Sequence, residues 1–462
     1  MKQIKLDKIF WGLIILGILI RILLLFMNPI TMWTDPVARY IPNTFDVLRG
    51  DFSFYTPPLM MMINSFPTIF LDGAILEFFW KLTPFIFFLL SVFIFIRILK
   101  NIELSELGRV FLLCLFLFSV YSILMSTTIM LEMPVLFFTL FLFYIFEKND
   151  KIDLKLFSII VRTSALLLYT KQTGYFIFAG FILYNLFKKM DKKQKKLILL
   201  ALILGLLLNV PWMIKNIAIY GNVLSGEEGV SEVKGIGDII NLDANYLLLT
   251  SEIFHLAYRI PYLSELNYFG IFFVLSRIYY FSFLIVSLFL TIVNIVGIIT
   301  YGRKYKRYIL IILPIFLFVF WLAFLSKNHF TLDFGRYMFS FYFLFFFFGL
   351  KFIENIRSVN IKRFLYLIII LFCILSIATS FAMSYEFHKK DIEIRKVAEF
   401  IKNKEGIFIS DDHYTRHALI FYTGNKIPPL DEGIKCQGGR KIYSSLKYKI
   451  YLNENKYYVC KL

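Results

Sequence analysis

The sequence predicts an all-α, polytopic membrane protein of about eleven transmembrane helices, with a folded first outer loop and a small extracytoplasmic C-terminal α/β unit. Three observations predict this fold class. Hydrophobic residues make up 59% of the 462 residues, and the mean hydropathy is +0.70. Apolar runs long enough to cross a hydrocarbon core of about 30 Å recur from residue 9 to residue 383. Lys and Arg gather in short connections between these runs, as in polytopic membrane proteins.

The positions of the predicted helices follow from the apolar runs, because roughly 20 helical residues cross the hydrocarbon core. Arg162 interrupts the fifth of these runs. The predicted helices cover residues 9–27, 74–99, 107–125, 128–146, 155–169, 172–188, 196–219, 269–300, 307–326, 335–355 and 362–383.

The distribution of basic residues predicts the orientation. A net charge of +18 would suggest nucleic acid in a soluble protein, but here the charge follows topology, and no nucleic-acid partner is expected. Every second connection is basic, with clusters beginning at Arg97, Lys148, Lys188, Arg303 and Arg357. Because Lys and Arg accumulate in cytoplasmic loops, we expect a multi-pass plasma-membrane protein with its N-terminus in the cytoplasm. The first helix has no cleavage site and is expected to be retained.

The predicted orientation divides the chain into two domains. A transmembrane domain covers residues 1–383 and includes outer loops at 28–73 and 220–268. The polar tail, residues 384–462, is expected to form the α/β unit, with helices at 391–404 and 413–423, a strand in IFIS, and strands in KYKIYLN and KYYVCKL. A disulfide between Cys436 and Cys460 in an external tail is chemically feasible, but the sequence does not decide it.

The first outer loop carries an unusual set of acidic, aromatic and proline residues. Asp35 precedes Pro36, which suits the first position of a helix, and a helix is expected from residue 37 to residue 48. Pro57 and Pro58 predict an extended chain before the next apolar segment. The structural alternative for Asp35 is that its carboxylate only caps this helix.

This loop resembles that of the GT-C glycosyltransferases, in particular the dolichyl-phosphate-mannose protein mannosyltransferases and the bacterial aminoarabinose transferases of lipid A. The resemblance rests on an acid after the first helix, then Tyr, Leu-x-Gly and Pro-Pro-Leu. The matching residues here are Asp35, Tyr40, Leu48 with Gly50, and Pro57 with Pro58 and Leu59. Two positions depart from the family pattern, because Pro36 stands where a second acid is usual and Thr56 where His or Lys is common.

Further motifs match the same families in the same order along nearly the whole chain, and together they are moderately specific. They are Arg21 in the first helix, Glu132 at the outer end of the fourth, Lys171 in a basic-x-x-Gly turn, the segment PWMIKNIAIYGN with Lys215, the pair Arg336 and Tyr337, and Phe-Tyr-Thr-Gly in the tail.

The resemblance implies an inverting glycosyltransferase that takes a sugar from a polyprenyl-phosphate donor at the outer face. Asp35 is the expected catalytic base, and Glu132 would orient the acceptor or assist Asp35. The residues expected to bind the donor phosphate are Arg21, Lys171, Lys215 and Arg336. The expected substrate pocket contains Trp33, Tyr40, Tyr55, Pro57, Pro58 and Tyr337. No cofactor or obligatory metal is predicted, because basic residues can balance a departing phosphate. The acceptor is left open among protein, glycan and lipid.

Several alternatives remain at this stage. Many apolar spans with a few intramembrane charges also suit a transporter or lipid flippase, and a non-catalytic component of a glycosylation complex is a third reading. Arg21, Lys215 and Arg336 could anchor helix ends at the membrane surface. Glu77 and Lys81 have the spacing of an ordinary helical ion pair.

Overall fold

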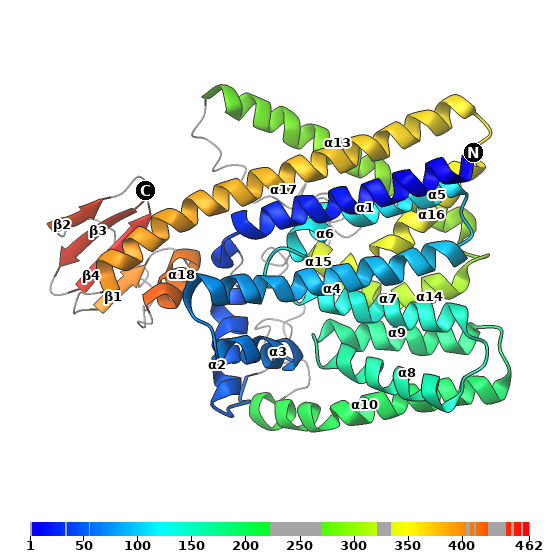
Figure 1. The fold of residues 1–462 in the computed structure, drawn as a ribbon, viewed down its shortest axis with the longest axis horizontal. Coiled ribbons are helices and arrows are strands. Elements are labelled where there is room, and N and C mark those ends of the chain that lie inside the picture. Colours follow the sequence, from blue (N-terminus) through cyan, green and yellow to red (C-terminus); the bar gives the residue numbers. More distant parts are fainter. Residues whose placement is uncertain are drawn as a thin grey trace, which may run out of the picture.

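The structure of the protein is a computed structural model. The structure describes residues 2–32, 35–54, 56–221, 270–320, 334–402, 407–410, 413–423, 440–444, 448–453 and 456–461. Its long helices lie side by side, and the C-terminal sheet lies beyond one end of them (Figure 1). Of the described helices, five are long and apolar enough to cross a membrane, and shorter apolar helices accompany them.

The helices coincide with the predicted apolar runs. They are α1 (Lys2–Met27), α4 (Gly73–Asn101), α5 (Glu106–Phe118), α6 (Val120–Met125), α7 (Glu132–Lys148), α8 (Leu154–Leu168), α9 (Thr173–Phe187), α10 (Lys192–Tyr220), α13 (Gly270–Tyr301), α14 (Lys306–Phe320), α15 (Phe334–Met338), η6 (Phe339–Phe341), α16 (Tyr342–Asn355) and α17 (Val359–Lys402). Their agreement with the sequence reflects the requirement that a chain in lipid satisfy its backbone polar groups internally.

Two of the predicted runs contain breaks. The run at 107–125 breaks at Ser119, which has an extended backbone and whose hydroxyl accepts a hydrogen bond from the amide of Ser122. The run at 335–355 is divided among α15, η6 and α16. These breaks lie near one another, since residues beside both line the same small pocket.

The last predicted membrane helix continues far past residue 383. We expected separate helices at 362–383 and 391–404, but α17 is one helix of 44 residues. The intervening residues 384–390 contain neither Gly nor Pro, so no residue there interrupts the backbone hydrogen bonds. The predicted boundary at residue 383 is therefore not a break in the chain's secondary structure.

The C-terminal segment forms a four-stranded sheet with one helix. The elements are β1 (Ile407–Ser410), α18 (His413–Thr423), β2 (Arg440–Ser444), β3 (Tyr448–Asn453) and β4 (Lys456–Lys461). The strand order is β1-β4-β3-β2; β1 pairs with β4 in parallel, and the other pairs are antiparallel. Strand β2 was not predicted. This segment packs on the helices, because α18 contacts α17 and the turn after Asp35. Cys436 lies outside the described residues, so the disulfide question stays open.

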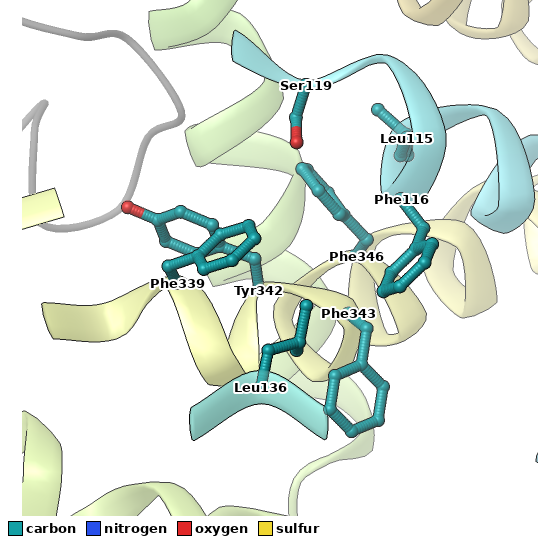
Figure 2. A pocket seen from close by; sticks show the side chains of 8 residues that line it. All are labelled: Leu115, Phe116, Ser119, Leu136, Phe339, Tyr342, Phe343 and Phe346. Carbon is teal, nitrogen blue, oxygen red and sulfur yellow. The ribbon is translucent and has the colours of Figure 1, made fainter. Parts of the chain in front are cut away.

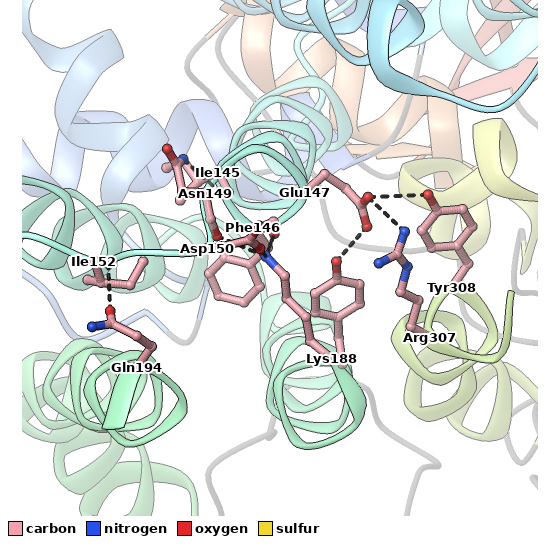
Figure 3. A network of polar contacts seen from close by, with 11 residues as sticks. Ile145, Phe146, Glu147, Asn149, Asp150, Ile152, Lys188, Gln194, Arg307 and Tyr308 are labelled. Carbon is pink, nitrogen blue, oxygen red and sulfur yellow. Dashed lines mark hydrogen bonds and ion pairs between the residues drawn. The ribbon is translucent and has the colours of Figure 1, made fainter. Parts of the chain in front are cut away.

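A polar layer joins the helix ends that carry the basic connections. Glu147 of α7 accepts hydrogen bonds from Tyr184 of α9 at 2.5 Å and from Arg307 of α14 at 3.2 Å. Lys188 donates to the Phe146 and Asn149 carbonyl oxygens and pairs with Asp150 (Figure 3). These contacts cap the C-terminal end of α7. The candidate site lies at the opposite ends of the helices.

Candidate active site

Asp35 precedes a short helical turn near the start of the first outer loop. The turn, η2 (Pro36–Tyr40), is π-helical and leads into α2 (Ile41–Leu48), as the predicted helix at 37–48 requires. The side chain of Asp35 makes no capping hydrogen bond to this helix. The capping alternative is therefore wrong, and the carboxylate is available for contacts across the molecule.

Glu132 and Lys171 form a buried ion pair. Glu132 is the first residue of α7, and Lys171 lies in the short turn between α8 and α9. The Lys171 Nζ donates to Glu132 Oε1 at 2.6 Å, and the two side chains are 9% and 3% exposed. An acid in the first turn of a helix is favoured by the helix dipole, so α7 and Lys171 both stabilise Glu132 in this position.

Arg336 connects this pair to Asp35. Its Nη1 donates to Asp35 Oδ2 at 2.7 Å, and its Nε lies 3.7 Å from Glu132 Oε1. Asp35 and Arg336 are each 15% exposed. The four side chains thus alternate in charge, from Asp35 through Arg336 and Glu132 to Lys171. We call these four residues the charged cluster.

Two predicted aromatic residues adjoin the charged cluster. Tyr337 lies beneath both cations, with its ring centroid 4.9 Å from Lys171 Nζ and 5.5 Å from Arg336 Cζ. Tyr40 is 6% exposed. Burial, together with the negative charges of Asp35 and Glu132, raises the pKa of the Tyr40 hydroxyl well above its ordinary value. Tyr40 therefore remains a neutral donor at physiological pH.

The cations set the protonation of Asp35. Burial by itself would raise the pKa of this carboxyl, but the positive charges of Arg336 and Arg39 outweigh burial and lower the pKa below its ordinary value. Arg39 Nη1 lies 3.5 Å from Asp35 Oδ1. Arg39 was missed in the sequence, although its position four residues after Asp35 in a predicted helix was a signal for such a pair.

Arg21 has a different setting from the one predicted. Its guanidinium is fully buried and lies 3.8 Å from the centroid of the Phe88 ring. It donates to the carbonyl oxygens of Gly17 and Leu117 and to the hydroxyls of Ser122 and Ser126. Because α5 ends at Phe118, the Leu117 carbonyl has no donor within the helix. Arg21 supplies that donor, and its guanidinium is bound between α1, α5 and the segment around Ser122 and Ser126. Binding of the donor phosphate by Arg21 stays a prediction.

Lys215 also lies outside the charged cluster. It donates to the carbonyl oxygen of Phe54 and to Asn216 Oδ1 at 3.0 Å, and it lies 3.8 Å from the Trp212 ring centroid. These contacts attach α10 to the segment before Pro57 and Pro58. The sequence did not indicate this structural use of the lysine.

The Pro-Pro segment is held against the turn that carries Lys171. Pro57 and Pro58 are buried, and the amide of Leu59 donates to the carbonyl oxygen of Tyr169 at 3.0 Å. They begin α3 (Leu59–Thr68). Two other predicted pocket residues, Trp33 and Tyr55, lie outside the described residues.

A small apolar pocket lies one helical turn deeper than the charged cluster (Figure 2). Leu136 follows Glu132 by four residues in α7, and Phe339 follows Arg336 by three, so one acid and one cation of the charged cluster each have a lining residue one turn further along the chain. The pocket is lined by Leu115, Phe116, Ser119, Leu136, Phe339, Tyr342, Phe343 and Phe346. This lining offers little polarity for a sugar, so the charged cluster above it is the better candidate for chemistry.

Within the described part of the chain, no three His, Cys, Asp or Glu side chains are grouped closely enough to hold a metal ion. The prediction that no metal is obligatory is not tested by this geometry.

Comparison with known proteins gives the fold. Neither a protein-family model nor a curated protein matches the sequence. The crystal structure of ArnT from Cupriavidus metallidurans bound to undecaprenyl phosphate matches with a TM-score of 0.55 at 11% identity, covering 91% of this chain and 86% of that one. The apo structure of the same protein gives a TM-score of 0.56 at 12% identity.

A second solved structure belongs to another enzyme with this architecture. The archaeal oligosaccharyltransferase AglB from Archaeoglobus fulgidus, in complex with an inhibitory peptide and a dolichol-phosphate, matches with a TM-score of 0.50 at 13% identity. The match covers 91% of this chain and 64% of that one.

The chain has the GT-C fold. The resemblance first noted from scattered motifs is therefore confirmed at the level of the fold. Within this GT-C fold, the charged cluster brings together four of the residues singled out in the sequence, and it separates them from Arg21 and Lys215.

Proposed function

We propose that this GT-C protein is an inverting glycosyltransferase that transfers a sugar from a polyprenyl-phosphate donor to an acceptor hydroxyl at the outer face of the membrane. One observation carries the proposal: Asp35, Glu132, Lys171 and Arg336 come from distant parts of the sequence and meet as alternating charges. Two carboxylates beside two cations are what transfer from a phosphate needs. The acceptor class, whether protein, glycan or lipid, is not specified by these residues.

The cations of the charged cluster suit the donor phosphate. Arg336 and Lys171 are now neutralised by the two acids, and an incoming phosphate would compete for them through charge-assisted hydrogen bonds. Arg336 Nε and Glu132 Oε2 are buried, and neither has a hydrogen-bond partner among the described residues. Because buried polar atoms are usually paired, these two atoms support a ligand that completes the site. Tyr337 would support the cations from below.

The same competition would prepare Asp35 to act as the base. When phosphate draws Arg336 away, the carboxylate loses the main charge that lowers its pKa, and its pKa rises towards the ordinary value. The acceptor oxygen then attacks the anomeric carbon as its proton passes to Asp35. The bond from that carbon to the phosphate oxygen breaks, and polyprenyl phosphate leaves with the electron pair. Glu132 would hold the acceptor in line for attack.

The position of the charges favours an enzyme over a transporter. A transporter commonly holds its ionisable groups at mid-depth on interrupted helices. Here Glu132 begins α7, and Lys171 lies between α8 and α9, at the ends opposite the basic connections. With those connections in the cytoplasm, the charged cluster faces outwards, close to the level expected for a lipid phosphate. ArnT and AglB, solved with undecaprenyl phosphate and a dolichol-phosphate respectively, support this donor class.

The test is sugar transfer by the purified protein. Wild type and Asp35→Asn are incubated in nanodiscs with radiolabelled polyprenyl-phosphate sugars and a membrane extract as the source of acceptor. Removal of a general base lowers the rate by about 10²-fold to 10⁴-fold. Asp46→Asn is the matched control, because Asp46 lies in the same outer loop, its side chain is 34% exposed, and its one ion pair within the described part of the chain is with Arg49 at 4.0 Å. Full transfer by Asp35→Asn would contradict the base assignment, and no transfer by wild type from any donor would favour a transporter.

A further inference from the structure

A buried carboxylate on the extended part of α17 joins the C-terminal segment to the segment before Asp35. Asp391 is 4% exposed and accepts three hydrogen bonds. Thr31 Oγ1 and Tyr422 Oη each donate to its Oδ1 at 2.5 Å, and Arg395 Nε donates to its Oδ2 at 2.7 Å. Thr31 belongs to η1 (Ile30–Met32), which ends three residues before Asp35.

Arg395 extends this contact to a further helix. Its Nη2 donates to Glu77 Oε2 at 2.9 Å near the start of α4, and its guanidinium lies 4.5 Å from the centroid of the Tyr422 ring. The expected pair of Glu77 with Lys81 is therefore wrong. Lys81 instead donates to the carbonyl oxygens of Leu25 and Asn28 at the end of α1, because those carbonyls have no donor within their own helix.

An apolar cluster reinforces the same connection. Val37 and Ile41, on the turn and helix that follow Asp35, belong to a buried cluster with Ile30. Phe421 and Tyr422 of α18 pack against this cluster. The turn that begins at Asp35 is thus held by α18 on one side, while the preceding η1 is held by Asp391.

We propose that Asp391 is a positioning residue for Asp35: through Thr31 and Tyr422 it clamps the Asp35 turn between α17 and α18. This inference rests on the proposed function and gives the Phe-Tyr-Thr-Gly motif of the tail its role. The Asp35 carboxylate pairs with Arg336 and Arg39, and the position of the backbone turn that carries it depends on the contacts of η1 and α18. A base that drifts by about 1 Å from its proton loses about 10²-fold in rate.

We call the hydrogen bonds of Asp391 with Thr31 and Tyr422 the clamp. Loosening it is expected to change particular kinetic constants and not others. Arg336 and Lys171 do not contact Asp391, so donor binding is retained when the clamp is loosened, whereas the step that uses Asp35 slows. We expect Thr31→Val and Tyr422→Phe, which each remove one hydroxyl, to lower kcat by about ten-fold to about 10²-fold and to change the donor KM by less than about two-fold. Asp391→Asn, which also breaks the ion pair with Arg395, is expected to lower kcat further.

Hydrogen–deuterium exchange gives a second readout that needs no activity. In the clamp variants, peptides covering residues 29–41 should exchange at least about ten-fold faster, while α7 and α9 keep wild-type protection. Ser384→Ala is the matched control, because Ser384 is a buried residue of α17 whose hydroxyl donates within the helix to the Ser380 carbonyl oxygen. It should leave both kcat and the exchange of residues 29–41 unchanged.

The outcomes separate this inference from the proposed function. Unchanged kcat and unchanged exchange in Thr31→Val and Tyr422→Phe would overturn the clamp. Faster exchange spread equally over all helices would also overturn it, because the hydroxyls would then serve only overall stability. If the wild type transfers no sugar, the proposed function fails, and exchange at residues 29–41 alone decides whether Asp391 holds the turn.

Discussion

Replacing Arg336 by Gln tests the central contact of the charged cluster. The substitution removes the cation that lies 2.7 Å from Asp35 and 3.7 Å from Glu132, and it leaves a shorter, neutral polar side chain. The net charge of the four residues changes from zero to minus one. The consequence is a carboxylate left in a largely buried site without its nearest counter-ion.

The expected loss in free energy of unfolding depends on the counter-ion that each acid keeps. Removing one partner of a buried ion pair costs about 3–5 kcal/mol in free energy of unfolding. Glu132 keeps Lys171 at 2.6 Å, and Asp35 keeps Arg39 at 3.5 Å and is 15% exposed. We therefore expect the lower end of that range, about 3 kcal/mol.

The assay is denaturant unfolding in detergent near pH 7, followed by tryptophan fluorescence. The double variant Asp35→Asn with Arg336→Gln should be more stable than Arg336→Gln alone by at least about 1 kcal/mol, because it removes the stranded charge. Arg357→Gln, at an exposed position at the other end of the helices, is the control and should stay within about 0.5 kcal/mol of wild type.

Two results would refute this reasoning. A loss below about 1 kcal/mol for Arg336→Gln would show that the ion pairs of the charged cluster are screened like surface pairs. A double variant as unstable as Arg336→Gln alone would show that the loss comes from packing around the guanidinium and not from the charge of the Asp35 carboxylate, which keeps only Arg39 as a counter-ion.

Two further predictions concern pH and Arg21. Because the folded-state pKa of Asp35 is lowered, its ionised form stabilises the protein above the ordinary carboxyl value of 3.8 and loses this effect as pH falls through the lowered value. The stability advantage of wild type over Asp35→Asn should therefore shrink between pH 5 and pH 2 in unfolding measurements; an advantage independent of pH would contradict it. Arg21→Met should lower the melting temperature while changing the donor KM by less than about two-fold, because Arg21 serves the carbonyl left open at the end of α5. A ten-fold rise in the donor KM would instead show that Arg21 binds the donor phosphate.

Several features of this protein were determined by the sequence alone. The helix positions follow from the apolar runs, because a chain in hydrocarbon must satisfy its own backbone hydrogen bonds. Glu132 stood out because an acid among apolar residues requires a partner or a function, and Asp35 stood out because its loop resembles that of the GT-C glycosyltransferases. The strands in KYKIYLN and KYYVCKL were also predicted, because Tyr, Ile and Val favour strands, and the structure pairs them as β3 and β4.

Other features were decided only by the tertiary structure. Asp35 and Arg336 are 301 residues apart, and no local pattern states that they meet. Arg21 and Arg336 look alike in the sequence, yet one completes a broken helix and the other joins two acids. Glu77 has Lys81 at helical spacing, but Arg395 takes its place because Lys81 is drawn to the carbonyls that end α1. In each case the charged side chain pairs with the unsatisfied polar group that the fold places within hydrogen-bonding distance. Long-range packing decides which group that is, so the sequence pattern around the residue does not reveal it.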